Sequence, residues 1–435
     1  MTARLSIRNG SRAFAHRNYQ LFFAGQGISL VGTWMQTVAQ AWLVLQLTRD
    51  PIWLGLLAAL QFLPVMVLGL FGGLIADALP KRRTLIATQT IQMLLAFALF
   101  GLTAGGVVQL WQILVLATLL GISNAVDMPT RQSFVVEMVG REDIANAIAL
   151  NSAMFNGARI VGPAVAGLAI GIFGLSVAFL INGVSFLAVI VAYLAMRDDD
   201  LHAPARYARP STVGEVRRTL GEGLRYVRRT EIVLMTTVLV GVVSTFGMNF
   251  GVTVPALAYD ILHTDATGYG FLMAACGVGA MSAALLIAFS GRQRPAFIPA
   301  GGILLGVGLI LGSSINAFWL AVPAMVVVGF GAVGMAATAN TAIQLAVPDH
   351  LRGRVISVYT TVFVGSTPVG GIIVGWLASR YGVDASLFVG GVACVAAGAL
   401  GFLWLRRITA RGAVRAAAHP AAAETPAGRA EPGAG

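Results

Sequence analysis

The stretch that decides the fold is NAIALNSAMFNGARIVGPAVAG, from Asn146 to Gly167. A related pattern returns 208 positions later as RVISVYTTVFVGSTPVGGIIVG, from Arg354 to Gly375. Six positions are identical at that offset: Ile148 with Ile356, Phe155 with Phe363, Gly157 with Gly365, Val161 with Val369, Gly162 with Gly370 and Gly167 with Gly375. Glycine lets membrane helices approach closely, so both copies are predicted to form the same kind of packing surface. The chain is therefore predicted to be duplicated.

The composition of the whole chain is that of a membrane protein. Hydrophobic residues make up 57% and charged residues only 11%, against about a quarter charged in soluble domains. A helix needs roughly 20 apolar residues to cross the hydrocarbon. Twelve such runs are predicted, at residues 19–46, 52–76, 84–104, 108–127, 146–171, 174–195, 232–258, 269–289, 296–314, 318–345, 355–379 and 385–405. The predicted fold class is an all-α membrane protein with twelve transmembrane helices in two pseudo-symmetric six-helix halves.

The net charge of +11 lies between the predicted spans. Of the 29 Lys and Arg residues, 26 fall in alternate loops, and the other side holds only Arg49 and Arg380. The positive-inside rule then predicts a multi-pass protein with both termini cytoplasmic. Because these charges flank spans rather than cover a water-exposed face, nucleic acid is not an expected partner. Cys276 and Cys394 lie in separate spans, without metal or disulfide spacing, and are interpreted as packing residues.

The duplication and the linker divide the chain into four parts. Residues 1–195 are expected to form the N-terminal half, 196–230 a cytoplasmic linker, 231–408 the C-terminal half and 409–435 a disordered tail. In the linker, Thr212 to Glu215 is typical of a capping box that starts a helix. Apolar residues then follow one face: Val213, Val216, Leu220, Leu224 and Val227. With arginines around it, this helix is expected to lie on the anionic cytoplasmic leaflet, or alternatively to bind a partner.

A polar stripe runs along the first predicted span. Its members recur every three or four residues, which places them on one helix face: Gln26, Ser29, Thr33, Gln36 or Thr37, and Gln40. Polar groups facing lipid are costly, so this face should meet water or protein. Two interpretations stay open: the stripe lines a substrate cavity, or it makes hydrogen bonds between helices.

The loop GGLIADALPKRR, residues 72–83, follows the second span. It resembles the signature G-x-x-x-D-[RK]-x-G-[RK]-[RK] between helices two and three of the major facilitator superfamily, through Gly73, Asp77, Lys81 and Arg82. Ala78 and Pro80 depart from that signature. The resemblance implies a gating loop.

Other motifs resemble one branch of that superfamily. The pair Gly162-Pro163 is similar to the glycine-proline signature of helix five in drug exporters, which implies a hinge because proline removes a backbone bond. Further matches are RNYQLFFAGQGISLVGTWMQ at residues 17–36, Asp127-Met128-Pro129 after span four and GARIVGPAVAG at residues 157–167. Together they resemble the bacterial exporters that include the enterobactin exporter and macrolide and multidrug efflux proteins, over nearly the whole chain to Ile408.

The resemblance implies a secondary active transporter that exports an amphiphilic small molecule, a siderophore or drug, by proton antiport and alternating access. The implied partners are the substrate, a coupling proton and membrane lipids, for a monomer without cofactor or metal. The expected substrate cavity is lined by polar and charged residues of several spans: Gln26, Thr33, Gln36, Gln40, Asn151, Asn156, Arg159, Asn249, Asn340 and Gln344. The alternative is a membrane-embedded enzyme or a lipid translocator. A P-loop is excluded because the only lysine, Lys81, stands between Pro80 and Arg82.

Proton coupling is expected to use a carboxylate. Asp127 is the first candidate and Asp77 the second, both placed near span ends. Arg159 is the deepest fixed charge, and it falls on Thr367 in the second copy. Three roles stay open for it: an anion-attracting group in the cavity, a coupling partner of Asp127, or a structural pair between spans four and five.

Overall fold

The computed structural model describes residues 11–202, 213–290 and 294–418. Twelve helices within that part are long and apolar enough to cross a membrane. The first six are α2 (Arg17–Thr48), α3 (Ile52–Ala78), α4 (Lys81–Ala104), α5 (Leu110–Val139), α6 (Ile144–Phe173) and α7 (Ser176–Leu194). The second six are α9 (Glu231–Gly247) continued by α10 (Phe250–Ala256), α11 (Ala266–Ser290), α12 (Phe297–Ser314), α13 (Phe318–Ala346), α14 (Asp349–Tyr381) and α15 (Val383–Ala418). The predicted fold class is confirmed.

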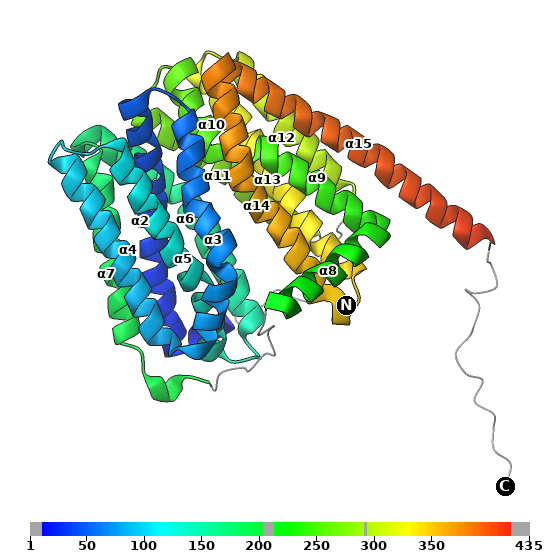
Figure 1. Cartoon of the computed structure of the whole chain (residues 1–435), viewed down its shortest axis with the longest axis horizontal. Coiled ribbons are helices and arrows are strands. Elements are labelled where there is room, and N and C mark those ends of the chain that lie inside the picture. The colour runs from blue at the N-terminus through cyan, green and yellow to red at the C-terminus, as the bar shows by residue number, and fades with distance from the viewer. Residues whose placement is uncertain (1–10, 203–212, 291–293, 419–435) are drawn as a thin grey trace, which may run out of the picture.

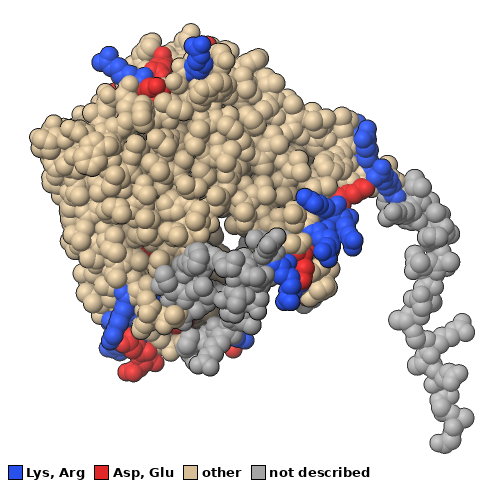
Figure 2. All heavy atoms as spheres, viewed as in Figure 1, with Lys and Arg blue, Asp and Glu red and all other residues tan. Residues whose placement is uncertain are grey.

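The two sets of six helices form two bundles that lie side by side (Figure 1). The helix α8 (Val213–Arg229) lies at the lower end of the view, between the bundles in sequence. Figure 2 shows charged side chains gathered at the two ends of the molecule, with a wide uncharged band between them. We call the end that carries Lys81, Arg82, Arg131 and Arg354 the basic end, and the end that carries Arg49 and Arg380 the opposite end.

The duplicated stretch forms the contacts between the two halves. In the first copy, a Cβ atom added at Gly167 would lie 2.9 Å from the carbonyl oxygen of Thr267 in α11. In the second copy, α14 packs on α3 so closely that a Cβ at Gly55 would lie 2.2 Å from the carbonyl oxygen of Gly371. Only glycine allows backbones to approach this far. The repeated pair Gly167 and Gly375 therefore lies at both seams, because a Cβ at Gly375 would lie 3.0 Å from the Pro51 carbonyl oxygen beside α3.

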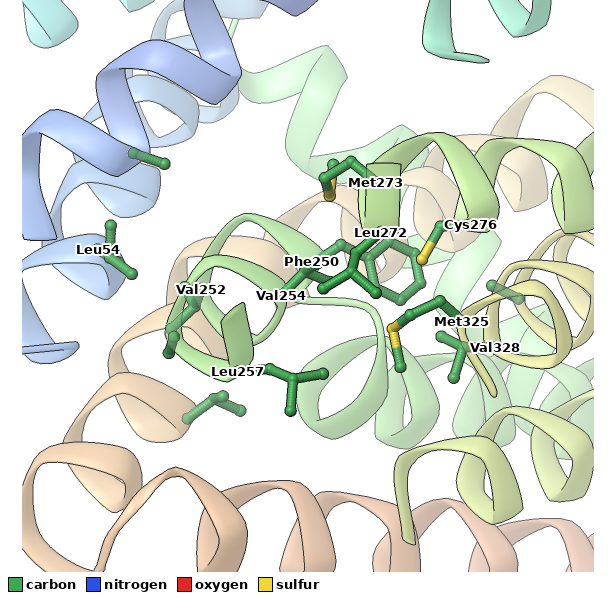
Figure 3. Packing of buried hydrophobic residues seen from close by; sticks show 14 of the residues in the cluster. Leu54, Phe250, Val252, Val254, Leu257, Leu272, Met273, Cys276, Met325 and Val328 are labelled. Atoms are coloured by element: carbon green, nitrogen blue, oxygen red, sulfur yellow. The ribbon is translucent and has the colours of Figure 1, made fainter. Parts of the chain in front are cut away.

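An aromatic cluster closes the opposite end. The ring of Trp42 in α2 lies 5.5 Å from that of Tyr259 and 5.9 Å from that of Tyr269, both in the second half. Trp42 and Tyr269 belong to the same buried core as apolar residues of α10, α11 and α13. Figure 3 shows three of these residues, Phe250, Leu272 and Met325. Cys276 lies in the same packing, and both cysteines are free and buried. The seam between the halves is therefore apolar at this end.

Two helix boundaries differ from the sequence expectations. Span four was expected to end at residue 127, but α5 continues to Val139 with Pro129 inside it. Span seven was expected to be continuous over residues 232–258, but it breaks between α9 and α10. The break leaves carbonyl groups without their helical partners, and the side-chain amide of Asn249 donates to two of them, those of Ser244 at 3.3 Å and Thr245 at 2.7 Å.

The linker helix and the end of the chain also differ from expectation. Tyr226 of α8 donates a hydrogen bond to the carbonyl of Ala346 at 3.1 Å, and Glu222 forms an ion pair with Arg354. Val227, expected to face lipid, is 2% exposed. The last turns of α8 are thus docked on the second half. Thr212 and the side chains of Val213, Val216 and Leu220 lie outside the described residues. The helix α15 extends to Ala418, past the expected start of the tail at residue 409, and residues 419–435 lie outside the described part.

Candidate functional site

A cavity of about 460 Å³ lies between α5 and α6 on the basic side of the seam. Its lining mixes apolar and amide side chains: Gln132, Val135, Ile144, Ile148, Asn151, Ser152, Phe155 and Asn156. The close glycine contacts of α6 with α11 lie at Arg159 and beyond it: a Cβ at Gly277 would lie 3.1 Å from the Arg159 carbonyl oxygen, and one at Gly167 would lie 2.9 Å from that of Thr267. The half of α6 nearer the basic end is therefore free to line a binding site, and its mixed chemistry suits an amphiphilic ligand.

Arg159 lies further along α6 than the residues that line this cavity. It follows Phe155 by four residues and Asn156 by three, so it lies on the same face of α6. Its guanidinium carbon is 5.9 Å from the centroid of the Trp34 ring in the first half and 5.7 Å from that of Phe250 in the second half. Aromatic faces stabilise a cation by their quadrupole. Among the described residues Arg159 forms no salt bridge, so its positive charge is held between the two halves without a carboxylate.

The aromatic residues around Arg159 also contact one another. The rings of Trp34 and Phe155 meet edge to face with centroids 5.8 Å apart. Phe155 is 47% exposed and lines the cavity, so this aromatic group connects the ligand space to the arginine. Trp34 and Phe250 were not among the sequence-predicted site residues. No short-range pattern links them to Arg159, because they come from three different helices.

Some residues of the polar stripe of α2 make hydrogen bonds between helices, and others do not. Gln36 accepts a hydrogen bond from the Asn182 amide at 2.7 Å, and Gln40 accepts one from Gln61 at 3.3 Å. These two glutamines are buried and serve contacts between helices. Gln26 is also buried, and its Oε1 has no hydrogen-bond partner among the described residues. Thr33 is exposed although α2 is surrounded by helices of both halves, so it faces interior space.

The remaining predicted cavity residues are spread over three places. Asn151 lines the cavity and accepts a hydrogen bond from the Tyr19 hydroxyl at 3.0 Å. Asn156 lines it too and donates to the Ser152 carbonyl at 2.8 Å. Asn249 is buried at the break after α9. Two further amides are exposed on α13, where Gln344 donates to Asn340 at 3.1 Å. The structure thus brings Asn151 and Asn156 together in the α5–α6 cavity. Asn249 directly precedes Phe250, whose ring contacts Arg159.

Asp127 is the centre of a second polar site, between α4 and α5. It is 1% exposed, in the interior of α5 rather than at a span end. Its Oδ1 accepts hydrogen bonds from Thr88 at 2.9 Å and Gln89 at 2.8 Å, and its Oδ2 lies 3.1 Å from Nη2 of Arg131. Asp127 is therefore not paired with Arg159, which the sequence analysis had considered as its partner. The partner is Arg131, one helical turn along α5, which the i, i+4 spacing would have indicated had α5 been extended past Pro129.

The surroundings of Asp127 are polar as well. Gln92 of α4 donates to Ser123 and to Asn124, each at 3.3 Å, and Ser123 donates to the Thr88 carbonyl at 3.3 Å. A buried carboxylate persists when charged groups and donors surround it, as here. The Arg131 side chain is 24% exposed, so the ion pair connects the buried carboxylate to solvent.

Lys81 and Arg82 of the expected gating loop make their contacts within the first half. The gating role of the loop stays a prediction. Lys81 forms an ion pair with Glu137 of α5. Arg82 binds the C-terminus of α7, donating to the carbonyls of Tyr193 at 2.7 Å and Leu194 at 2.8 Å, and it pairs with Asp198 at 2.6 Å. A cation at a helix C-terminus is favourable because unpaired carbonyls point at it. The surroundings of Gly73 and the side chain of Asp77 lie outside the described part of the structure.

The expected hinge Gly162-Pro163 lies inside a continuous α6. A Cβ at Gly162 would be 2.4 Å from the Trp34 Cβ, and the Pro163 carbonyl is 2.4 Å from where a Cβ on Gly270 would lie. The pair therefore permits close packing of α6 on both α2 and α11. Its role as a hinge stays a prediction.

Two six-helix halves that pack through α3 with α14 and through α6 with α11 have the arrangement of a transporter of the major facilitator superfamily. The fold agrees with solved structures: a bacterial homologue of the human lysosomal transporter Spinster, inward-facing and unoccupied, aligns with a TM-score of 0.70 over 92% of this chain and 98% of that chain, at 14% identity. The chain belongs to the family described as transmembrane secretion effector, which matches residues 11–425.

Curated relatives agree with that family. The multidrug efflux pump Tap of Mycolicibacterium fortuitum is 30% identical over 83% of this chain and 88% of its own length. The staphyloferrin A transporter of Staphylococcus aureus is 22% identical over 86% and 93%. The chain is therefore a multi-pass membrane transporter of a family whose relatives include a siderophore transporter and drug efflux pumps, and it is not an enzyme.

Proposed function

We propose that the chain is a proton-coupled exporter of an amphiphilic small molecule, of the siderophore or drug type, that works by alternating access. The observation that carries the proposal is the geometry around Arg159. From this residue to the opposite end the halves pack glycine to backbone, whereas toward the basic end α5 and α6 line a cavity. A site at the junction of the two halves is exposed alternately when they rock. The name of one relative, the multidrug efflux pump Tap, supports export.

The substrate proposed for this cavity has an apolar body and an anionic group. Ile148 and Phe155 offer apolar surface, while Asn151 and Asn156 offer amide groups. Arg159 offers a positive charge that no carboxylate among the described residues neutralises. An anionic substrate would bind this guanidinium and gain charge-assisted hydrogen bonds in place of its water.

The test replaces Arg159 in the full-length protein reconstituted in liposomes. Arg159→Ala is expected to abolish transport of a fluorescent amphiphilic anion and to leave transport of a cationic dye such as ethidium measurable. Arg159→Lys should retain part of the anion transport, because it keeps the charge but loses the planar guanidinium. Arg380→Ala, an exposed arginine at the opposite end, is the matched control. Unchanged kinetics of Arg159→Ala for every substrate would refute the site.

For proton coupling we propose Asp127 with Arg131. A proton on Oδ2 of Asp127 would neutralise the carboxylate and release Arg131 from the ion pair. The released Arg131 can reach solvent, so protonation changes the contacts at the basic end of α5. Asp127→Asn imitates the protonated form. It is expected to lose net efflux driven by a proton gradient while it retains exchange of substrate for substrate.

Controls for Asp127 come from the same chain. Asp384→Asn removes an exposed carboxylate at the opposite end and should transport normally. Asp127→Glu keeps a carboxylate and should retain coupling. Full proton-driven efflux by Asp127→Asn at equal expression would exclude Asp127 as the carrier. Asp77 is the second candidate, and loss of coupling in Asp77→Asn alone would transfer the role to it.

We further propose that the protein lies in the inner membrane of a bacterial cell. Its basic end faces the cytoplasm, and both termini are cytoplasmic. The cavity would then open where an exported substrate is loaded. The proposed working unit is a monomer that needs no cofactor, with halves at residues 1–195 and 231–408. A membrane-impermeant maleimide should label Arg49→Cys in intact cells and should not label Arg406→Cys. The reverse labelling would overturn the orientation.

A further inference from the structure

A second cavity, of about 660 Å³, lies on the outer side of the second half between α9 and α15. Its walls are apolar side chains such as Val238 and Val242 of α9 and Ala396 and Leu400 of α15. At one end the lining changes to two arginines, Arg407 and Arg411. The cavity is a groove on the membrane-facing side of the protein, separate from the α5–α6 cavity of the proposed transport site.

The length and position of the groove correspond to those of a lipid chain. The lining along α15 runs from Ala393 to Arg407, which at about 1.5 Å per residue is roughly 21 Å. Half of the hydrocarbon core is about 15 Å thick. The groove therefore extends from the level of the lipid headgroups past the middle of the membrane. Trp404, also in its lining, is of the type that anchors proteins at the membrane interface.

The arginines leave positive charge at the mouth of the groove. Arg411 is paired with Glu231 at 2.6 Å, and both of these side chains are well exposed. Arg407 is exposed and has no ion pair among the described residues. One uncompensated cation thus stands where the apolar groove meets the headgroup level. This combination of charge and apolar length complements an anionic phospholipid.

We propose that this groove binds an anionic phospholipid of the leaflet at the basic end. One acyl chain lies against Ala396 and Leu400, and the phosphate lies at Arg407, with Arg411 as a second donor. The small alanine side chains of α15 provide the space for the acyl chain. The bound lipid fills the contact surface between the first and last spans of the second half.

The test titrates purified, delipidated full-length protein with phosphatidylglycerol and phosphatidylcholine and measures bound lipid by native mass spectrometry. Phosphatidylglycerol should bind more tightly. Arg407→Gln should weaken its binding about fivefold, the effect of one basic residue near a lipid surface, and should leave phosphatidylcholine unchanged. Arg406→Gln is the matched control, because it removes the same charge one residue away and outside the groove lining.

A second variant tests the apolar part. Ala396→Phe fills the groove and should reduce binding of both lipids, whereas Ala399→Phe, exposed but outside the groove lining, should not. Equal effects of Arg406→Gln and Arg407→Gln would show that the lipid is attracted by the general surface charge and not by a binding site. Equal binding of the two lipids to the wild type, or unchanged binding in Ala396→Phe, would also overturn the proposal.

Discussion

Substitution of Gly55 by alanine should shift the protein away from the conformation that is closed at the opposite end. The new Cβ would lie 2.2 Å from the Gly371 carbonyl oxygen, whereas ordinary contacts begin at 3.4 Å, and the neighbour is backbone that cannot rotate away. Overpacking of this kind costs about 1–3 kcal/mol. If the halves relieve it by separating, the ratio of the two conformations changes about 5- to 150-fold.

Gly69 offers a matched control in the same helix. A Cβ there would meet nothing within 4 Å, so Gly69→Ala changes helix propensity as Gly55→Ala does, by about 1 kcal/mol, but creates no clash. The difference between the two variants isolates the contact between α3 and α14.

The assay measures access to the interior from the opposite end. Thr33→Cys is the reporter, in a chain in which Cys276 and Cys394 are replaced by alanine. In reconstituted vesicles, a membrane-impermeant maleimide applied at the opposite end should label the reporter slowly in the parent and in Gly69→Ala. In Gly55→Ala the labelling should be at least several times faster. Equal rates in the two variants would refute the claim that this glycine contact holds the halves closed.

Three other predictions concern single contacts. Asn182→Leu should lower the melting temperature in detergent, because it leaves the buried Gln36 without its donor at a cost of about 1–3 kcal/mol; the double substitution with Gln36→Leu should recover part of the loss. Trp34→Ala should weaken binding of an anionic probe, measured by fluorescence titration, by about 2- to 30-fold, while Trp319→Ala, at a position 81% exposed, should not. Arg82→Gln should lower the melting temperature and the transport rate together, since it releases the C-terminus of α7; a normal melting curve would contradict that structural role.

The sequence predicts the architecture well for a physical reason. Spans are set by local hydrophobicity, and the repeated glycines of Asn146 to Gly167 mark helix faces that must approach a backbone. Among them, Gly167 forms a contact between the halves, and Gly162 forms one with α2 within the first half. The break of span seven near Asn249 was not predicted from the sequence. A side-chain amide can replace lost helical hydrogen bonds there, and hydropathy does not detect such a replacement.

The candidate site could be predicted only in part. Arg159 was identified because it is the charge that the second copy lacks. Its aromatic neighbours Trp34 and Phe250 come from distant helices, so only the tertiary structure reveals them. Asp127 was identified but placed at a helix end, because the apolar run was expected to stop at residue 127. The helix α5 continues to Val139 with Pro129 inside it, since neighbouring helices in a membrane bundle allow proline inside a span. That error concealed Arg131, the partner of Asp127.

The most direct test of the proposed function is substrate flux in liposomes that contain only the full-length protein, with and without a pH gradient. An imposed proton gradient should accelerate movement of an anionic amphiphile against the direction of proton flow, and collapse of the gradient by an ionophore should return the flux to the passive rate. Flux that does not respond to the gradient, or the absence of flux from correctly inserted protein, would contradict the account.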